Sequence, residues 1–326
     1  MQDRFQRQIN YLRISLTDRC NLRCVYCMPE DGVQWIPHDE VLTIEEIVSV
    51  VQAGVAVGIR KVRLTGGEPL VRKGLLDLIQ RLNAIPEIDD IAITTNGILL
   101  GDMAQDLKSA GLKRVNISLD TLKPDRFKQV TRGGNLDEVK RGIETALACG
   151  LEPVKLNTVA IRGFNDDELV DLAKLTLDKP LNVRFIELMP IGTSDSWSQA
   201  NFVHAEEIKK LIASQLGKLE NEEIIPGNGP ASYSRLAGAQ GTIGFISAVS
   251  NHFCATCNRL RLTASGQLRP CLFNGREADL KQSLRRGAGK EELVRVFQEA
   301  IWSKPDGHDL NVGWGKEDRI MSQIGG

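Results

Sequence analysis

Apolar and polar residues alternate along six short segments in the N-terminal part of the chain, and most of these segments are followed by a stretch with helical spacing. The alternation predicts six strands, near residues 11 to 16, 61 to 65, 91 to 95, 114 to 119, 153 to 159 and 182 to 188. Strands that alternate with helices are typical of a parallel sheet with right-handed crossovers. Six such units fall short of eight, so we expect a partial (β/α)6 TIM-like barrel, with an open doubly wound sheet as the alternative.

Helix boundaries are marked by two kinds of signal. Thr43 and Glu46 have the spacing of a capping box, apolar residues recur with helical spacing from Leu136 to Leu147, and Asn165 with Glu168 predicts a further helix start. Three glycines each follow a predicted helix and precede a predicted strand: Gly58, Gly111 and Gly150. Glycine in this place is typical of a left-handed helix C-cap, so these positions indicate helix-to-strand turns.

One face of the predicted strands is polar, and the other is almost wholly apolar. With a period of two, the polar face carries Arg13, Ser15, Thr17, Arg63, Thr65, Thr94, Asn96, Asn116, Ser118, Asp120, Lys155 and Asn157. A small closed barrel fills its interior with branched apolar residues, so a polar inner face predicts a roomy lumen that binds a ligand. A set of solvated edge strands is the alternative, but it would need many edges in one sheet.

The pattern changes after residue 190. Residues 224 to 241 are rich in glycine, proline and small polar residues and predict a connection. Residues 241 to 273 predict short strands with a turn at 264 to 267, and residues 290 to 302 predict an amphipathic helix. We therefore expect a partial barrel over residues 1–223 and a C-terminal region over residues 224–326.

Composition narrows the functional class. The 326 residues are 42% hydrophobic and carry a formal net charge of −1, so no general basic field favours nucleic acid. Met1–Asn10 lacks the apolar core of a secretory signal, and no apolar run is long enough to span a bilayer. We therefore expect a cytoplasmic protein with neither nucleic acid nor membrane as a partner.

Three cysteines, Cys20, Cys24 and Cys27, stand in a C-x-x-x-C-x-x-C run directly after the first predicted strand. Cubane iron–sulfur clusters usually take four thiolates, so three suggest one iron left open for a ligand that is not protein. A zinc site lacking one recognisable ligand, or two structural cysteines and a third unrelated one, are the alternatives. The odd total of seven cysteines disfavours disulfide pairing.

A second set of three cysteines, Cys254, Cys257 and Cys271, flanks the predicted turn near the C-terminal end. His252 could complete a Cys3His zinc site, so this set by itself fits zinc and a second cluster about equally well. Two triplets in one chain favour a second cluster. The remaining cysteine, Cys149, lies at a predicted helix end and is interpreted as a small buried residue.

A glycine-rich loop, Gly66-Gly67-Glu68-Pro69, follows the second predicted strand, where barrel enzymes place ligand-binding loops. The cysteine run followed by this loop resembles the radical S-adenosylmethionine superfamily. Further segments extend the likeness: Thr94–Gly97, Asn116–Leu122, the C-x-x-C-N-R-L-R-L-T run from Cys254 and the terminal Gly325-Gly326. Over essentially its whole length the chain is similar to the GTP 3′,8-cyclase family of molybdenum cofactor biosynthesis.

The resemblance implies a partial barrel whose mouth is closed by a C-terminal region that bears the second cluster. It implies that each cysteine set holds a [4Fe-4S] cluster and that S-adenosylmethionine binds the first. The residues at S-adenosylmethionine-contacting positions are Tyr26, Gly67, Ser118 and Met189. The residues at GTP-contacting positions are Arg13, Arg63, Thr94, Lys155, Arg259 and Arg261. Of these, Arg259 and Arg261 are expected at the catalytic centre together with the diglycine end, Gly325 and Gly326.

The family's reaction is a lyase-class cyclisation. A 5′-deoxyadenosyl radical made from S-adenosylmethionine abstracts hydrogen from C3′ of GTP, and the substrate radical adds to C8. The product is (8S)-3′,8-cyclo-7,8-dihydroguanosine 5′-triphosphate. The implied partners are GTP, an external electron donor, a downstream cyclic pyranopterin monophosphate synthase and a second copy in a homodimer. The alternatives are another radical enzyme with an auxiliary cluster, acting on a peptide, and a metal-bearing binding protein without catalysis.

Overall fold

Six parallel strands follow one another across the sheet in the order of the chain. The computed structural model describes residues 1–29, 31–189, 199–222, 229–273, 277–308 and 321–324. The six strands are β1 (Tyr11–Ser15), β2 (Lys61–Thr65), β3 (Asp90–Thr95), β4 (Arg114–Ser118), β5 (Val154–Ala160) and β6 (Leu181–Glu187). The six predicted strands are therefore confirmed.

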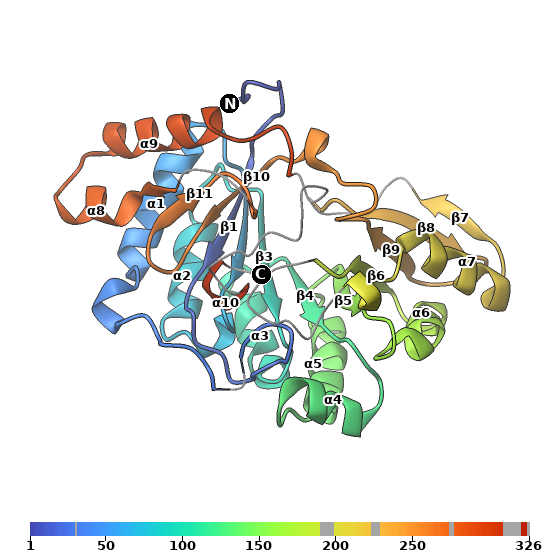
Figure 1. Ribbon diagram of the computed structural model, residues 1–326. Helices are drawn as coiled ribbons and strands as arrows, with labels where there is room; N and C mark the ends of the chain where they lie inside the picture. Colours follow the sequence, from blue (N-terminus) through green and yellow to red (C-terminus); the bar gives the residue numbers. More distant parts are fainter. Residues whose placement is uncertain (30, 190–198, 223–228, 274–276, 309–320, 325–326) are drawn as a thin grey trace.

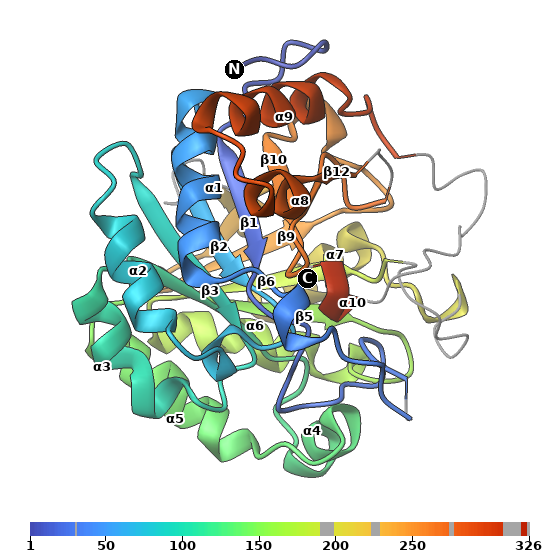
Figure 2. The same cartoon turned by 90° about the vertical axis from the view of Figure 1, so that its left-hand side faces the viewer.

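Six helices connect these strands or follow them. They are α1 (Ile44–Ala56), α2 (Leu75–Asn83), α3 (Leu100–Ala110), α4 (Pro124–Thr131), α5 (Leu136–Ala148) and α6 (Leu169–Asp178). Short 3-10 turns accompany them: η1 (His38–Glu40), η2 (Pro69–Val71) and η3 (Asp166–Glu168). In Figure 2, α1, α2, α3 and α5 cover one side of the sheet. The partial (β/α)6 arrangement is confirmed.

The apolar face of the strands packs under these helices. Side chains such as Leu12, Val62, Ile117 and Leu156 belong to one buried hydrophobic cluster together with residues of α1, α2, α3 and α5. The alternation along β1 to β5 therefore assigns the apolar side chains to the helix-covered face. It leaves the polar side chains on the other face of the sheet.

Two of the predicted helix signals have different outcomes. The capping box is confirmed, because Glu46 N donates to Thr43 Oγ1 at 3.1 Å and Thr43 N donates to Glu46 Oε2 at 2.8 Å. The helix start at Asn165 is confirmed in position, because Asn165 precedes η3 and η3 leads directly into α6 at Leu169, but its side chain forms no cap hydrogen bond. The Asn165 amide instead donates to Asp120 O at 2.8 Å, because buried carbonyl groups of the neighbouring loop need donors.

The chain that follows β6 continues the same sheet at both of its edges. Its strands are β7 (Leu219–Glu222), β8 (Ser232–Leu236), β9 (Thr242–Ile246), β10 (Arg259–Leu262), β11 (Gln267–Arg269) and β12 (Ala278–Asp279). β10 pairs in parallel with β1, and β9 pairs in parallel with β6. The strand order is β12-β11-β10-β1-β2-β3-β4-β5-β6-β9-β8-β7, so β12 and β7 are the edges.

The expected connection over residues 224–241 is wrong in part, because β8 lies inside it and forms antiparallel pairs with β7 and β9. The turn at 264 to 267 is confirmed by the antiparallel pairing of β10 with β11. The division at residue 223 stays a prediction. Among the described residues after β6, the helices are α7 (Ala205–Leu216), α8 (Leu280–Arg285), α9 (Lys290–Trp302) and α10 (Met321–Ile324). The same residues contain the 3-10 turns η4 (Gln199–Asn201) and η5 (Cys254–Thr256).

The short helix α10 lies on the polar side of the sheet, opposite α1, α2 and α3 (Figures 1 and 2). No helix in the described ranges combines the length and the apolar character that crossing a membrane requires.

Candidate active site

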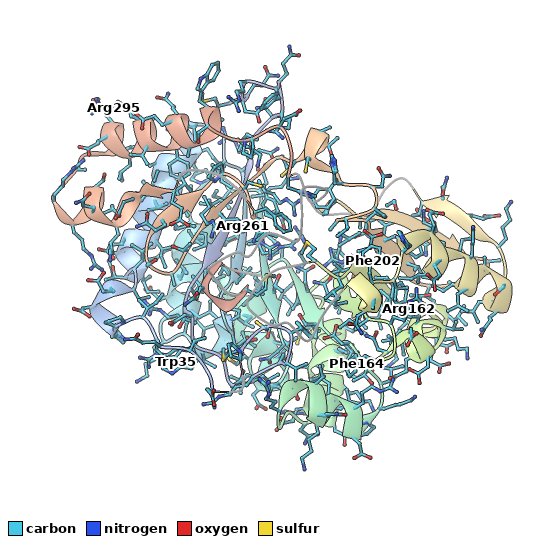
Figure 3. The ribbon with its side chains drawn as sticks, viewed as in Figure 1. Trp35, Arg162, Phe164, Phe202, Arg261 and Arg295 are labelled. Atoms are coloured by element: carbon cyan, nitrogen blue, oxygen red, sulfur yellow. The ribbon has the colours of Figure 1, made fainter. Side chains whose placement is uncertain are left out.

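Strand register lines up four arginines on the polar face of the sheet. Arg261 of β10 is paired with Arg13 of β1, and Arg13 is paired with Arg63 of β2. The row continues through Ala92 of β3 to Arg114 of β4. Paired residues of neighbouring strands point to the same face, so the four guanidinium groups share one side of the sheet. Figure 3 shows Arg261 in the middle of the molecule, over the sheet.

Two further cations come from the next strands. Lys155 of β5 is 3% exposed and donates to the Tyr233 hydroxyl at 3.2 Å. Arg184 of β6 is 2% exposed and donates to the Asn116 side chain at 2.8 Å. Sequence reasoning missed Arg114 and Arg184, although the two-residue period that selected Asn116 also assigns Arg114 to this face.

We call Arg13, Arg63, Arg114, Lys155, Arg184 and Arg261 together the cationic chamber. Burial and repulsion between these side chains lower the pKa of several of them. Burial lowers the pKa of Arg63 and that of Arg261 to about 10, and neighbouring arginines act in the same direction. Burial lowers the pKa of Lys155 to about 6, with Arg184, Arg114 and Arg63 adding to the effect. Asp90 forms an ion pair with Arg114.

Several buried donor groups of the chamber have no hydrogen-bond partner within the described part of the chain. They are Arg13 Nε, Arg63 Nε, Arg114 Nη1 and Arg184 Nε, and the hydroxyl of Tyr11, which precedes Arg13 on the same face of β1, is likewise without a partner. Buried polar atoms are nearly always hydrogen-bonded, and buried cations need compensating charge. The chamber therefore has the chemistry of a site for a multiply charged anion such as a polyphosphate.

The first cysteine set lies at the carboxyl ends of the strands, in the loop after β1. Cys20 Sγ accepts hydrogen bonds from Leu22 N at 3.4 Å and from Asn96 Nδ2 at 3.7 Å. Burial raises the pKa of Cys24, and the nearby thiols of Cys27 and Cys20 also raise it. Three neighbouring thiols with N–H groups directed at sulfur are a donor set that fits an iron–sulfur cluster.

The glycine loop packs against the chain that leads into this cysteine loop. A Cβ atom on Gly67 would lie 2.4 Å from Arg19 O, and one on Gly66 would lie 2.7 Å from Thr17 O. Gly67 N donates to Thr17 O at 2.7 Å. Only glycine permits this approach, so the loop after β2 and the cysteine loop form one unit.

Two buried carboxylates lie at the carboxyl ends of the strands, near the first cysteine set. Burial raises the pKa of Glu68 to about 7, although Thr95 Oγ1, Asn96 N and Leu70 N all donate to its side chain. Burial also raises the pKa of Asp120 to about 6, and this carboxylate accepts a hydrogen bond from the Tyr26 hydroxyl. Neither carboxylate was singled out for this role by the sequence, because Thr95 and Asn96 at Glu68 and Tyr26 at Asp120 come from distant segments.

The other predicted contact residues lie on the strands, at their carboxyl ends or in the cysteine loop. Ser118 ends β4, Thr94 belongs to β3, and Met189 follows β6; all three are half-buried. Tyr26 is likewise half-buried in the cysteine loop. Trp35, in the chain that follows this loop, lies at the lower rim in Figure 3. Gly325 and Gly326 lie outside the described residues.

The second cysteine set lies at the opposite ends of the strands. Cys254 and Cys257 come directly before β10, which runs parallel to β1, and Cys271 comes directly after β11. β1 has five residues, so its two ends are about 13 Å apart at the usual rise of a strand. The cationic chamber occupies this interval.

The second set is surrounded by positive charge. Burial acts to raise the pKa of Cys257, but the charges of Arg259 and Lys304 outweigh it and lower the pKa to about 6. Burial raises the pKa of Cys254, and the thiols of Cys271 and Cys257 also raise it. Cations beside three thiols suit a cluster held by thiolates. Within the described ranges, no three His, Cys, Asp or Glu side chains form a group that could hold a single metal ion, so the support for a cluster at each set comes from its three cysteines and their surroundings.

Curated relatives match this chain from end to end. A GTP 3′,8-cyclase of Pelotomaculum thermopropionicum is 60% identical over 326 residues, and all of both chains is covered. GTP 3′,8-cyclases of Heliobacterium modesticaldum and Moorella thermoacetica are each 56% identical, again over all of both chains. The chain belongs to the GTP 3′,8-cyclase family.

Two family models match different parts of this member of the GTP 3′,8-cyclase family. Residues 14–176 match the Radical SAM superfamily, and residues 181–310 match Molybdenum Cofactor Synthesis C. Among solved structures, Streptococcus suis SuiB is similar with a TM-score of 0.60 at 12% identity, covering 84% of this chain and 64% of that one. SuiB bound to S-adenosylmethionine has a TM-score of 0.59 at 12% identity and covers 91% of this chain and 76% of that one. These likenesses support the radical SAM fold.

Proposed function

We propose that this chain converts GTP to (8S)-3′,8-cyclo-7,8-dihydroguanosine 5′-triphosphate, the first step of molybdenum cofactor biosynthesis, by radical chemistry. One observation carries the proposal: a buried chamber of cations lies between two sets of three cysteines. A triphosphate brings several negative charges into a poorly solvated space, and guanidinium groups with a lysine are suited to offset them. A peptide substrate would not require so many internal cations.

The first cysteine set, Cys20, Cys24 and Cys27, would hold a [4Fe-4S] cluster, and S-adenosylmethionine would complete its open iron. When bound, these groups supply a 5′-deoxyadenosyl radical. Tyr26, Gly67, Ser118 and Met189 would contact S-adenosylmethionine. The hydrogen bond from Tyr26 to Asp120 supports this role, because it fixes the cysteine loop against the end of β4.

The cationic chamber would bind GTP. Arg13, Arg63 and Lys155 would neutralise the triphosphate, with Arg114 and Arg184 beside them. Thr94 would add a hydroxyl contact. Arg259 and Arg261 lie on the strand that begins at the second cysteine set, so they would act at the catalytic centre between the base and the phosphates. Preorganised charge of this kind lowers the cost of holding a folded substrate.

The second cysteine set, Cys254, Cys257 and Cys271, would hold a second [4Fe-4S] cluster beside the guanine. The diglycine end, Gly325 and Gly326, would reach the same chamber, and the place of α10 on the polar side of the sheet supports this. We further propose a cytoplasmic enzyme that takes electrons from an external donor. Its product would pass to a cyclic pyranopterin monophosphate synthase, and it would work as a homodimer.

Anaerobic reconstitution with iron and sulfide tests the proposal. The reconstituted chain is incubated with S-adenosylmethionine, a reductant and each nucleoside triphosphate in turn. We expect cyclised product with GTP and none with ATP, CTP or UTP. Zinc without iron, or cleavage of S-adenosylmethionine with product from a peptide but not from GTP, would contradict the proposal.

A further inference from the structure

A buried lysine joins the two arms of chain that carry the second cysteine set. Lys304 follows α9 and is 2% exposed. Its Nζ donates to Arg259 O at 2.9 Å and to Pro270 O at 2.5 Å. Arg259 lies two residues after Cys257, and Pro270 directly precedes Cys271. One ammonium group therefore sets the separation of these two cysteines through their main chains.

A buried arginine from the N-terminal segment holds the remaining cysteine. Arg7 is 6% exposed, and its Nη1 donates to Cys254 O at 2.9 Å and to Asp306 O at 2.8 Å. Its Nη2 donates to Pro305 O at 2.6 Å. Asp3 braces the guanidinium, because Arg7 Nε donates to Asp3 Oδ2 at 2.6 Å. In both ribbon views the N-terminal segment runs beside the end of α9 (Figures 1 and 2).

The chain after Lys304 covers the same cysteine. A Cβ atom built on Gly307 would lie 3.5 Å from Cys254 Cβ and 3.8 Å from Cys254 Sγ. The main-chain N–H of His308 is directed at the Cys254 thiol. Residues 304–308, which we call the C-terminal strap, thus lie against the cysteine set over several consecutive residues.

Burial of the two cations, Lys304 and Arg7, is unfavourable unless their charges are compensated. Burying an ammonium or a guanidinium group costs more than burying an apolar side chain of the same size. Carbonyl groups offset part of that cost for both cations, and Asp3 offsets more of it for Arg7. Three thiolates would offset more of the cost of burying Lys304, because they bring negative charge close to its ammonium group. The position of Lys304 is therefore better explained by a charged occupant than by packing.

We propose that Lys304 and Arg7 are positioning residues for the second cluster: both hold Cys254, Cys257 and Cys271 ready to receive it, and Lys304 also offsets the charge of the thiolates. Outer partners that orient first ligands tune metal affinity in this way in many metal sites. The inference rests on the proposed function, because it requires the second cysteine set to hold a cluster.

The test compares Lys304→Met with Lys290→Met, an exposed lysine at the start of α9. Both are made in the full-length chain with Cys20, Cys24 and Cys27 replaced by alanine, so that only the second set binds iron. After anaerobic reconstitution, loss of iron to a chelator is followed by absorbance. We expect at least tenfold faster loss for Lys304→Met and an unchanged rate for Lys290→Met.

Arg7→Lys is the second variant, because it keeps the positive charge and loses the forked contacts. We expect a threefold to tenfold faster loss of iron, and this variant decides the matter if Lys304→Met fails to fold by circular dichroism. In the chain with both sets intact, iron at the first set and cleavage of S-adenosylmethionine should be unchanged in both variants. Iron loss from both sets alike would indicate a general structural role and overturn the inference.

Retention of second-set iron at the parent rate in both variants would also overturn the inference, while leaving the proposed function in place. A parent chain that takes up only one cluster would overturn the second cluster of the proposed function, and this inference with it. The iron content of the parent chain therefore distinguishes the two failures.

Discussion

The two cysteine sets differ in how the fold builds them. Cys20, Cys24 and Cys27 come from one short run in the loop after β1, and the glycine loop after β2 packs directly onto it. The second set joins Cys254 and Cys257, before β10, with Cys271, after β11. Hydrogen bonds from both terminal parts of the chain hold it. A local loop forms the first set, whereas the second depends on the assembled sheet.

Their electrostatic surroundings also differ. Burial and the neighbouring thiols raise the pKa of Cys24. Two buried carboxylates, Glu68 and Asp120, lie with the first set at the carboxyl ends of the strands. At the second set, Arg259 and Lys304 lower the pKa of Cys257 to about 6 despite its burial. The comparison indicates that the first set is organised by shape and hydrogen bonds, and the second by positive charge.

Removing one cysteine from each set is the strongest way to break this comparison. Cys24→Ala should abolish formation of 5′-deoxyadenosine, because the first set would no longer hold its cluster. Cys271→Ala should leave that cleavage measurable and abolish the cyclised product. Chromatography of both products and iron per chain check this, with Cys149→Ala as the control outside both sets. Cyclised product from the Cys271→Ala chain would contradict the proposed role of the second set.

Gly67→Ala tests whether shape organises the first set. The added methyl group would meet the Arg19 carbonyl at 2.4 Å, so we expect a loss of about 3 kcal/mol in the free energy of unfolding. Cleavage of S-adenosylmethionine should fall by more than about a hundredfold, since a small misplacement at a reacting centre is costly. Gly289→Ala, which meets nothing within 4 Å, should change stability by less than about 1 kcal/mol. Equal effects of the two substitutions would show that the glycine loop does not shape the site.

Arg63→Met separates function from stability in the cationic chamber. Arg63 is 6% exposed and its Nε has no partner within the described chain, so removing the charge should raise the free energy of unfolding by about 1 kcal/mol without ligand. The same change should weaken GTP binding by roughly thirtyfold to a hundredfold, the loss of a charged hydrogen bond. Urea unfolding and calorimetry measure the two effects. Arg295→Met, on the exposed face of α9, is the control and should change neither; a destabilised Arg63→Met chain with normal GTP affinity would contradict the prediction.

The pH dependence of GTP binding gives the smallest expected effect. Burial and the neighbouring arginines lower the pKa of Lys155 to about 6, so this amine is mostly neutral at pH 7 without ligand. A bound triphosphate should raise the pKa, and binding should then take up a proton. Affinity should therefore fall by up to about tenfold per pH unit above pH 6. Calorimetry in buffers of different ionisation enthalpy measures the uptake, and Lys155→Met should remove it; an equal uptake in Lys155→Met would assign the proton to another group.

Local signals in the sequence predicted much of the fold. Alternation predicted β1 to β6, and the capping box of Thr43 and Glu46 is formed. Left-handed glycines close the expected turns at Gly58, Gly111 and Gly150. Local signals failed where contacts with distant segments decide the structure. The Asn165 side chain donates to Asp120 O instead of capping a helix. The segment expected as a connection contains β8, because it pairs with β7 and β9.

The sequence alone determined the residues that share a face, because side-chain direction in a strand follows from its period of two. It also determined the first cysteine set, because its three thiols are close neighbours in the chain. Only the tertiary structure decided which arginines meet, since the register of β10, β1 and β2 brings Arg261, Arg13 and Arg63 together. It likewise decided that Lys304 and Arg7 hold the second cysteine set. Hydrogen bonds between residues far apart in the chain form only after the sheet has aligned them, so no local pattern records them.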